Sequence, residues 1–269
     1  MLKDITLGQY FPGNSVVHRL DPRTKLIMLV VYIVTLFMAT NVVSYALVAG
    51  FLFVAIKIST IPMKSIVRGM KPLVLILVFT GILNLFFTVG EGEPLVDFWV
   101  ITIYTEGLLR AFFMVIRILM LISCTFLLTY TTSPLALTDG LEHLLAPLKK
   151  IKVPVHELAM MMSIALRFIP TLIEETDKIM SAQRARGASF DTGNLIQKAK
   201  ALIPLLVPLF ISAFRRAEEL ATAMECRCYH GGQGRTRMKQ LRFRSTDLLF
   251  MMGAVVLAVG VGLLGHWGF

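Results

Sequence analysis

Hydrophobic and polar positions form long blocks in this chain, as in membrane-spanning helices. The first block, Leu26 to Ile56, contains no charged residue over 31 positions. As one helix it would be about 46 Å long, which exceeds the ~30 Å hydrocarbon core of a bilayer. Asn41, followed by a β-branched pair, marks a tight break, so this block predicts two short spans.

Three further apolar blocks are each long enough to cross a bilayer, namely Pro72 to Gly90, Gly107 to Tyr130 and Leu248 to Gly265. The pattern predicts an all-α integral membrane protein with about five transmembrane helices. Residues 98–104 (FWVITIY) are either a short strand or an interfacial segment. The expected domains are an N-terminal membrane domain (1–130), a cytoplasmic domain (131–246) and a C-terminal transmembrane helix (247–269).

The distribution of basic residues predicts the orientation. Residues 1–25 and 57–71 hold four each and residues 131–246 hold seventeen, whereas the acidic stretch 91–106 holds none. Basic loops stay in the cytoplasm, so the N-terminus is predicted inside and the C-terminus outside the cell membrane. The same rule explains the net charge of +10 without a nucleic-acid partner, and no nucleic-acid-binding motif is visible.

No catalytic, cofactor or metal site is predicted. The chain has neither a phosphate-binding G-x-x-x-x-G-K-[ST] loop nor a plausible nucleophile and base pair. Cys226 and Cys228, with His230, lack a second ligand cluster that would complete a metal site. With Cys124 in an apolar run, the three cysteines form no disulfide framework.

The cytoplasmic domain is expected to hold three helices. Ser133-Pro134 starts an amphipathic helix that we expect along the membrane surface. Two long helices follow, Val155 to Gly187 and Leu195 to Cys228, each apolar in its first half and charged in its second. The charged residues Arg215, Arg216, Glu218 and Glu219 form either a solvated helix face or contacts with the other long helix; the sequence leaves both open.

Each long helix ends in an arginine between small residues, Ala185-Arg186-Gly187 and Cys226-Arg227-Cys228. A cation in the last turn complements the helix dipole, and glycine commonly stops a helix, so a purely structural explanation exists for either end. The repetition of the same arrangement favours a functional role instead. Arginine suits docking because its planar fork binds carboxylates or carbonyls in several directions.

Two arginines interrupt the fourth apolar block. Arg110 and Arg117 are seven residues apart and therefore share a helix face. Charges within a membrane normally face protein or water. Arg110 either extends to the outer interface or faces protein, whereas Arg117 lies deeper and is expected to pack against another span or a partner.

Several stretches resemble the transmembrane T component of energy-coupling factor (ECF) transporters, in the order in which that family has them. They are DPRTKL (21–26), SPLALTDGLEHLLAPL (133–148), ALRFIP (165–170), AQRARG (182–187) and RRAEELATAMECRCY (215–229). The resemblance covers nearly the whole chain.

The resemblance implies a non-catalytic scaffold subunit of an ABC-type importer for vitamins or other micronutrients. Its two X-Arg-X motifs would dock on two cytoplasmic ATPase subunits, and the long helices would pass ATP-driven motion to a separate substrate-capturing membrane subunit. The apolar first halves would contact that subunit, through Met161, Leu166, Leu206 and Phe210. The alternatives are a stand-alone secondary transporter with its own substrate site and, less favoured by the sequence, a membrane-embedded enzyme. A secondary transporter would need polar or charged groups in mid-membrane, where only Arg110, Arg117 and a few hydroxyls are available. An enzyme would need a catalytic constellation, and none is visible in the sequence.

Overall fold

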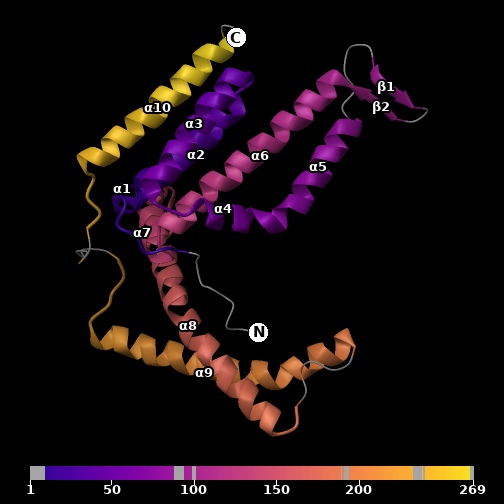
Figure 1. Ribbon diagram of the computed structural model, residues 1–269. Coiled ribbons are helices and arrows are strands. Elements are labelled where there is room, and N and C mark those ends of the chain that lie inside the picture. Colours follow the sequence, from indigo (N-terminus) through magenta and orange to yellow (C-terminus); the bar gives the residue numbers. More distant parts are fainter. Residues whose placement is uncertain are drawn as a thin grey trace. The chain divides into compact units, whose positions relative to one another are not determined.

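The computed structural model describes residues 10–87, 94–98, 101–188, 190, 194–232, 238 and 240–266 (Figure 1). These residues form two compact units. We call the first, residues 10–140 with 241–266, the membrane unit. We call the second, residues 141–240, the helix-pair unit.

The membrane unit consists of helices and one small hairpin. Its elements are α1 (Val16–Arg19), α2 (Pro22–Met38), α3 (Val42–Ser59), α4 (Met63–Met70), a 3₁₀ turn (Lys71–Leu73), α5 (Val74–Phe87), β1 (Pro94–Phe98), β2 (Ile101–Tyr104), α6 (Thr105–Thr131) and α10 (Ser245–His266). A further helix, α7 (Pro134–Leu144), runs from this unit into the helix-pair unit, where the 3₁₀ helix Ala146–Ile151 follows it.

The predicted break in the first apolar block is confirmed. Helix α2 ends at Met38, and α3 begins at Val42 after Asn41. The start of α2 is also specified locally, because the carboxylate of Asp21 accepts a hydrogen bond from the Arg23 N–H and Pro22 occupies the first helical position. The basic stretch before the third predicted span contains a short helix, α4, which the sequence analysis did not predict.

The segment between α5 and α6 contains the short strand that was one of its two interpretations. Strands β1 and β2 pair antiparallel, with Phe98 opposite Ile101 and Asp97 opposite Thr102. Residues 99 and 100 of the predicted segment 98–104 lie outside the described residues.

The apolar core of the membrane unit joins α2, α3, α6 and α10. Its fully buried members include Leu36, Val48 and Val261, with Tyr32 and Leu127 close to full burial. These residues come from helices that are far apart in the sequence but packed side by side. Because lipid is as apolar as these side chains, the contact stabilises the unit through close van der Waals packing between the helices.

Buried charges tie the ends of these helices together. Lys25 donates through Nζ to the Thr131 carbonyl at the end of α6 (2.9 Å) and to the His18 carbonyl at the end of α1 (3.4 Å). Asp247, only 1% exposed, accepts from the backbone N–H of Asp21 (2.8 Å) and from that of Arg244 (2.8 Å). The stretch 21–25 therefore links α1, α2, α6 and α10 at one end of the unit.

Five described helical segments are long and apolar enough to cross a bilayer, as predicted in number. They are Val42–Ser59, Met63–Leu85, Gly107–Thr131, Val155–Ala185 and Ser245–Gly265. These five segments differ from the five predicted spans in one helix. Helix α2, the predicted first span, has 17 residues and a length of about 26 Å, slightly less than the ~30 Å core. The fifth segment is instead α8 (Val155–Ala185), which was predicted to be cytoplasmic.

We predict that α2 crosses the bilayer and that α8 does not, because the second half of α8 carries charged residues that are costly in lipid. Glu93 and Met238 would then lie on opposite sides of the membrane. Single cysteines, Glu93→Cys and Met238→Cys, in a chain without its three native cysteines test this by labelling intact cells with an impermeant thiol reagent. Glu93→Cys should label at once and Met238→Cys only after permeabilisation. Labelling of both from the same side would show that α8 crosses the bilayer.

Candidate functional site

The helix-pair unit is built on α8, 31 residues long, and α9 (Leu195–Cys226), 32 residues long. Their bounds agree with the two long helices predicted from the sequence. Figure 1 shows them crossing each other at an angle. At the start of α9, the Gln197 side chain accepts a hydrogen bond from the Asn194 N–H at 3.1 Å, which satisfies one of the free donors at a helix N-terminus.

Proline residues lie inside both helices, at Pro170 in α8 and at Pro204 and Pro208 in α9. Each removes one backbone hydrogen bond and crowds the preceding turn, so it favours a local bend. All three lie on the N-terminal side of the place where the helices are joined by polar contacts.

Those polar contacts centre on Glu175 of α8. Its carboxylate accepts a short hydrogen bond from the Ser212 hydroxyl of α9 and pairs with the Arg216 guanidinium at 2.9 Å. The question that the sequence left open for Arg216 is therefore settled in favour of contact between the long helices. The pair is partly exposed, so its contribution to stability is about 0.2–1 kcal/mol, but it fixes the point at which the helices meet.

The C-terminal end of α8 is a Schellman motif with Arg186 as its cap residue. The N–H of Ala188 donates to the Gln183 carbonyl at 3.0 Å, and the N–H of Gly187 donates to the Arg184 carbonyl at 2.9 Å. Gly187 has φ +88°, the left-handed conformation that this motif requires.

The end of α9 repeats this motif residue for residue. The N–H of Tyr229 donates to the Met224 carbonyl at 3.0 Å, and the N–H of Cys228 donates to the Glu225 carbonyl at 2.8 Å. Arg227 is the cap residue, and Cys228, with φ +56°, takes the position of Gly187. Gly187 thus has a structural reason, because the residue after each arginine must adopt a left-handed backbone, which glycine adopts without strain.

The two cap arginines present their side chains to solvent. Arg186 and Arg227 are exposed, and neither makes a side-chain hydrogen bond, ion pair or ring contact within the described part of the chain. The neighbouring Arg184 differs, because its guanidinium lies over the Phe190 ring at 6.0 Å. The flanking residues Ala185 and Cys226 are exposed as well. Both ends are therefore open to a partner.

The apolar first halves of the two helices also expose large side chains. Met161, Leu206 and Phe210 are 54%, 49% and 61% exposed, and Leu166 is partly buried. These four residues lie in the turns before the Glu175 contact, and the helix pair leaves them largely uncovered. Such a surface suits lipid or an apolar partner.

The intramembrane arginines have different environments. Arg117 of α6 donates to the Tyr45 hydroxyl at 2.7 Å and to the Ala39 carbonyl at 3.3 Å, and it lies over the Phe37 ring at 5.3 Å. It therefore stabilises the turn between α2 and α3 by binding a free carbonyl at the end of α2. Arg110 is exposed on the same helix.

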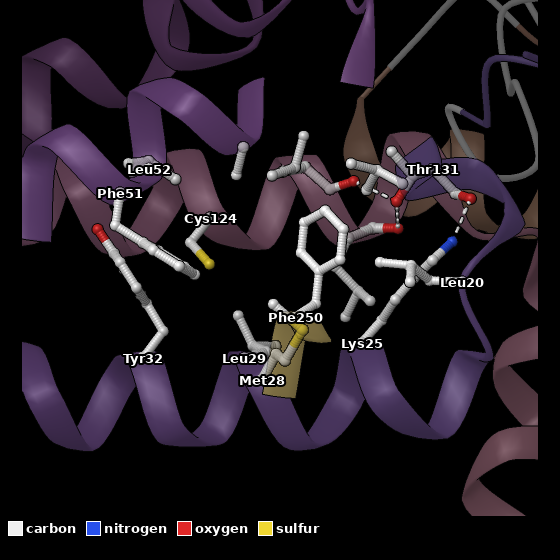
Figure 2. A pocket seen from close by; sticks show the side chains of 14 residues that line it. Leu20, Lys25, Met28, Leu29, Tyr32, Phe51, Leu52, Cys124, Thr131 and Phe250 are labelled. Atoms are coloured by element: carbon white, nitrogen blue, oxygen red, sulfur yellow. Dashed lines mark hydrogen bonds between the residues drawn. The ribbon is translucent and has the colours of Figure 1, made fainter. Parts of the chain in front are cut away.

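The membrane unit contains a small, mainly apolar cavity. It lies between α1, α2, α3, α6 and α10 and has a volume of about 60 Å³. Figure 2 shows Lys25 at one end, hydrogen-bonded, and Tyr32 with Cys124 at the other. Sites for small molecules typically measure ~300–1,000 Å³, so this cavity is too small for the substrate of a stand-alone transporter.

Apolar helices of spanning length, a crossed helix pair and two exposed cap arginines characterise a helical membrane protein. The family model described as "Cobalt transport protein" (CbiQ) matches residues 13–238. The energy-coupling factor transporter transmembrane protein EcfT of Clostridium kluyveri is 53% identical over 270 residues, 100% of both chains. The EcfT of Thermosediminibacter oceani is 56% identical over 259 residues (96% of this chain, 97% of the relative), and that of Bacillus subtilis 48% over 258 residues (96% and 97%).

The chain belongs to this family, the transmembrane components of energy-coupling factor transporters, and it is a multi-pass membrane protein. The resemblance inferred from its motifs is thereby confirmed.

The two Schellman ends give a direct prediction. Gly187→Ala should weaken the end of α8 by about 1 kcal/mol, since a left-handed L residue is strained although there is room for the added Cβ. Cys228→Gly should strengthen the end of α9 by a similar amount. Amide hydrogen exchange in the last turn of each helix should change about fivefold, faster in the first variant and slower in the second. Each variant should leave the other helix end unchanged, and an equal effect at both ends would contradict the prediction.

Proposed function

We propose that this chain is the coupling subunit of an importer, placed between two cytoplasmic ABC-type ATPase subunits and a membrane subunit that captures the substrate. The ATPase subunits hydrolyse ATP, and the chain itself catalyses nothing. The cargo is selected by the capturing subunit and belongs to the vitamins or other micronutrients. The observation that carries the proposal is the identical presentation of Arg186 and Arg227 on two matching helix ends.

Two helix ends with the same backbone geometry suit two similar ATPase subunits, one at each end. Each arginine stands at a helix end whose last carbonyls are already bonded within the Schellman motif. Its guanidinium is therefore available for a carboxylate or for carbonyls of another protein. One ATPase subunit would bind at Ala185, Arg186 and Gly187, and the other at Cys226, Arg227 and Cys228.

The crossing of the helices supports a lever mechanism. From Glu175 to Arg186 the helix measures about 16 Å, and from Ser212 to Arg227 about 22 Å. The polar contact between Glu175, Ser212 and Arg216 holds the helices together at one point between the charged ends and the apolar halves. When the ATPase subunits move relative to each other, the arginine ends follow, and the apolar halves on the other side of the crossing move in turn.

The apolar halves provide the contact with the capturing subunit. Exposed Met161, Leu206 and Phe210, with Leu166, offer a surface without fixed polar pairs. An adaptable apolar surface permits a partner to shift on it during transport, because apolar packing is not directional.

The arginines should be central to the ATPase interface. Arg186→Ala or Arg227→Ala should weaken ATPase binding by about 2–5 kcal/mol, roughly 1.5 to 3.5 decades in affinity. The double variant should release the ATPase subunits and abolish uptake. Binding of the co-expressed ATPase subunits, measured by affinity purification in mild detergent, together with uptake in cells, checks both statements.

Lysine substitutions at the two positions and an alanine substitution of Arg215 provide the controls. Lysine at either position should restore little binding, because it keeps the charge and loses the planar fork. Arg215→Ala removes an exposed arginine from the same helix, away from its end, and should leave binding near normal. If the arginines only complemented the helix dipole, alanine would cost about 0.3–1 kcal/mol and lysine would rescue well. A double alanine variant that retains its ATPase subunits and transports normally would refute the role.

The division of labour along the helices makes a separate prediction. Met161→Glu or Leu206→Glu should loosen the capturing subunit, because burying an unpaired carboxylate against an apolar partner is unfavourable. ATPase binding should persist. Ala221→Glu, at an exposed position in the charged half of α9, should affect neither. Purification of the complex with quantification of each subunit checks this, and joint loss of both partners would contradict the assignment.

A further inference from the structure

A polar hollow lies on the membrane unit beside the start of α10. It has a volume of about 470 Å³ and is lined by Asn14, Val16, Arg19, Arg244, Ser245 and Thr246. The lining joins the segment before and within α1 to the residues just before and within the first turn of α10. The proposed coupling role uses none of these residues.

Two guanidinium groups in this hollow are unpaired. Arg19 and Arg244 are exposed, and neither side chain has a hydrogen-bond or ion-pair partner in the described parts of the chain. The nearby carboxylate of Asp247 does not neutralise them by direct contact. Its two oxygens accept the backbone N–H groups of Asp21 and Arg244, and the residue is buried. The hollow is therefore cationic and rich in hydrogen-bond donors, with the amide of Asn14 and the hydroxyls of Ser245 and Thr246 on its wall.

The surroundings of the hollow are apolar on one side. Leu248 and Leu249, in the first turn of α10, are 62% and 64% exposed, and Met252 one turn further is exposed as well. Phe243 is also exposed, and the Arg23 guanidinium lies over its ring at 5.2 Å. Aromatic and basic residues together at the end of an apolar helix are typical of the level at which lipid headgroups lie.

A cationic hollow lined by Ser245 and Thr246, followed directly in α10 by the exposed Leu248 and Leu249, matches the two halves of one ligand. We propose that it binds an anionic phospholipid, with the phosphate between Arg19 and Arg244 and an acyl chain along the exposed leucines of α10. Arginine binds phosphate oxygens through paired N–H donors, and serine and threonine hydroxyls add further donors. A free phosphate would occupy the hollow without using the apolar face, which is why a lipid fits the observations better.

The bound lipid would fix the start of α10 against α1. Arg19 belongs to the end of α1 and Arg244 directly precedes α10, so one phosphate bridges two segments that are distant in the sequence. This extends the link that Asp247 and Asp21 already make between the same parts of the unit. The proposal does not depend on the ATPase-docking role of Arg186 and Arg227.

The test measures lipid binding to the full chain in detergent by native mass spectrometry. Phosphatidylglycerol is titrated against the unaltered chain, the double variant Arg19→Gln/Arg244→Gln, and the double variant Lys64→Gln/Arg242→Gln. The second variant removes two exposed basic residues of the same unit that do not line the hollow. Each basic residue near an anionic lipid contributes about fivefold in affinity, so the first variant should bind about 25-fold more weakly and the second almost normally.

Two further measurements distinguish a lipid phosphate from free phosphate. They do not depend on the folding of the variants. On the unaltered chain, phosphatidylglycerol should bind well above phosphatidylcholine, and inorganic phosphate at millimolar concentration should not displace it. A photoreactive phosphatidylglycerol should cross-link to peptides containing residues 14–19 or 244–249. Equal weakening in both double variants, displacement by inorganic phosphate, or cross-links confined to other segments would each overturn the proposal.

Discussion

The membrane unit depends on how three buried charges are accommodated at one end of its helices. Lys25, Asp21 and Asp247 are at most 7% exposed, and unpaired charges in such a place would be very costly. Here Lys25 Nζ is bound by the carbonyl oxygens at the ends of α1 and α6, and Asp247 accepts two backbone N–H groups. Each charge satisfies groups that a helix end leaves free. The same contacts fix which helices can be neighbours, because they join positions 226 residues apart.

This network also gives a physical reason for one of the stretches that carry the resemblance. In DPRTKL, Asp21 and Pro22 begin α2, and Lys25 holds the ends of two other helices. The sequence shows this motif at the start of the first apolar block. Its partners could not be predicted, because Thr131 and Asp247 look like ordinary residues at the edges of apolar blocks. Contacts over such separations depend on tertiary packing, which periodicity does not report.

The elements themselves were largely predictable, and the exceptions have physical causes. Long uncharged blocks identify spanning helices well, and the break near Asn41 follows from a block that is too long for one crossing. Helix α4 was missed because Pro62 and the four basic residues of 57–71 resemble a loop, although Met63–Met70 is strongly amphipathic. Helix α8 is ambiguous because its apolar half satisfies the requirements of a span and its charged half does not. Length and composition describe both halves at once, so they cannot decide between a span and a helix at a boundary.

The two arginine ends show what the structure adds to the sequence pattern. The repeated arrangement and the chemistry of arginine favoured a docking role, and the structure adds a backbone requirement at the position after each arginine. Gly187 meets it without strain, and Cys228 meets it at a cost of about 1 kcal/mol. The two ends therefore present arginine in the same geometry but differ in how firmly that geometry is held. If two ATPase subunits bind there, the end of α9 is the one that a partner must stabilise more. The helix pair is thus symmetric in the shape of its ends and asymmetric in their stability.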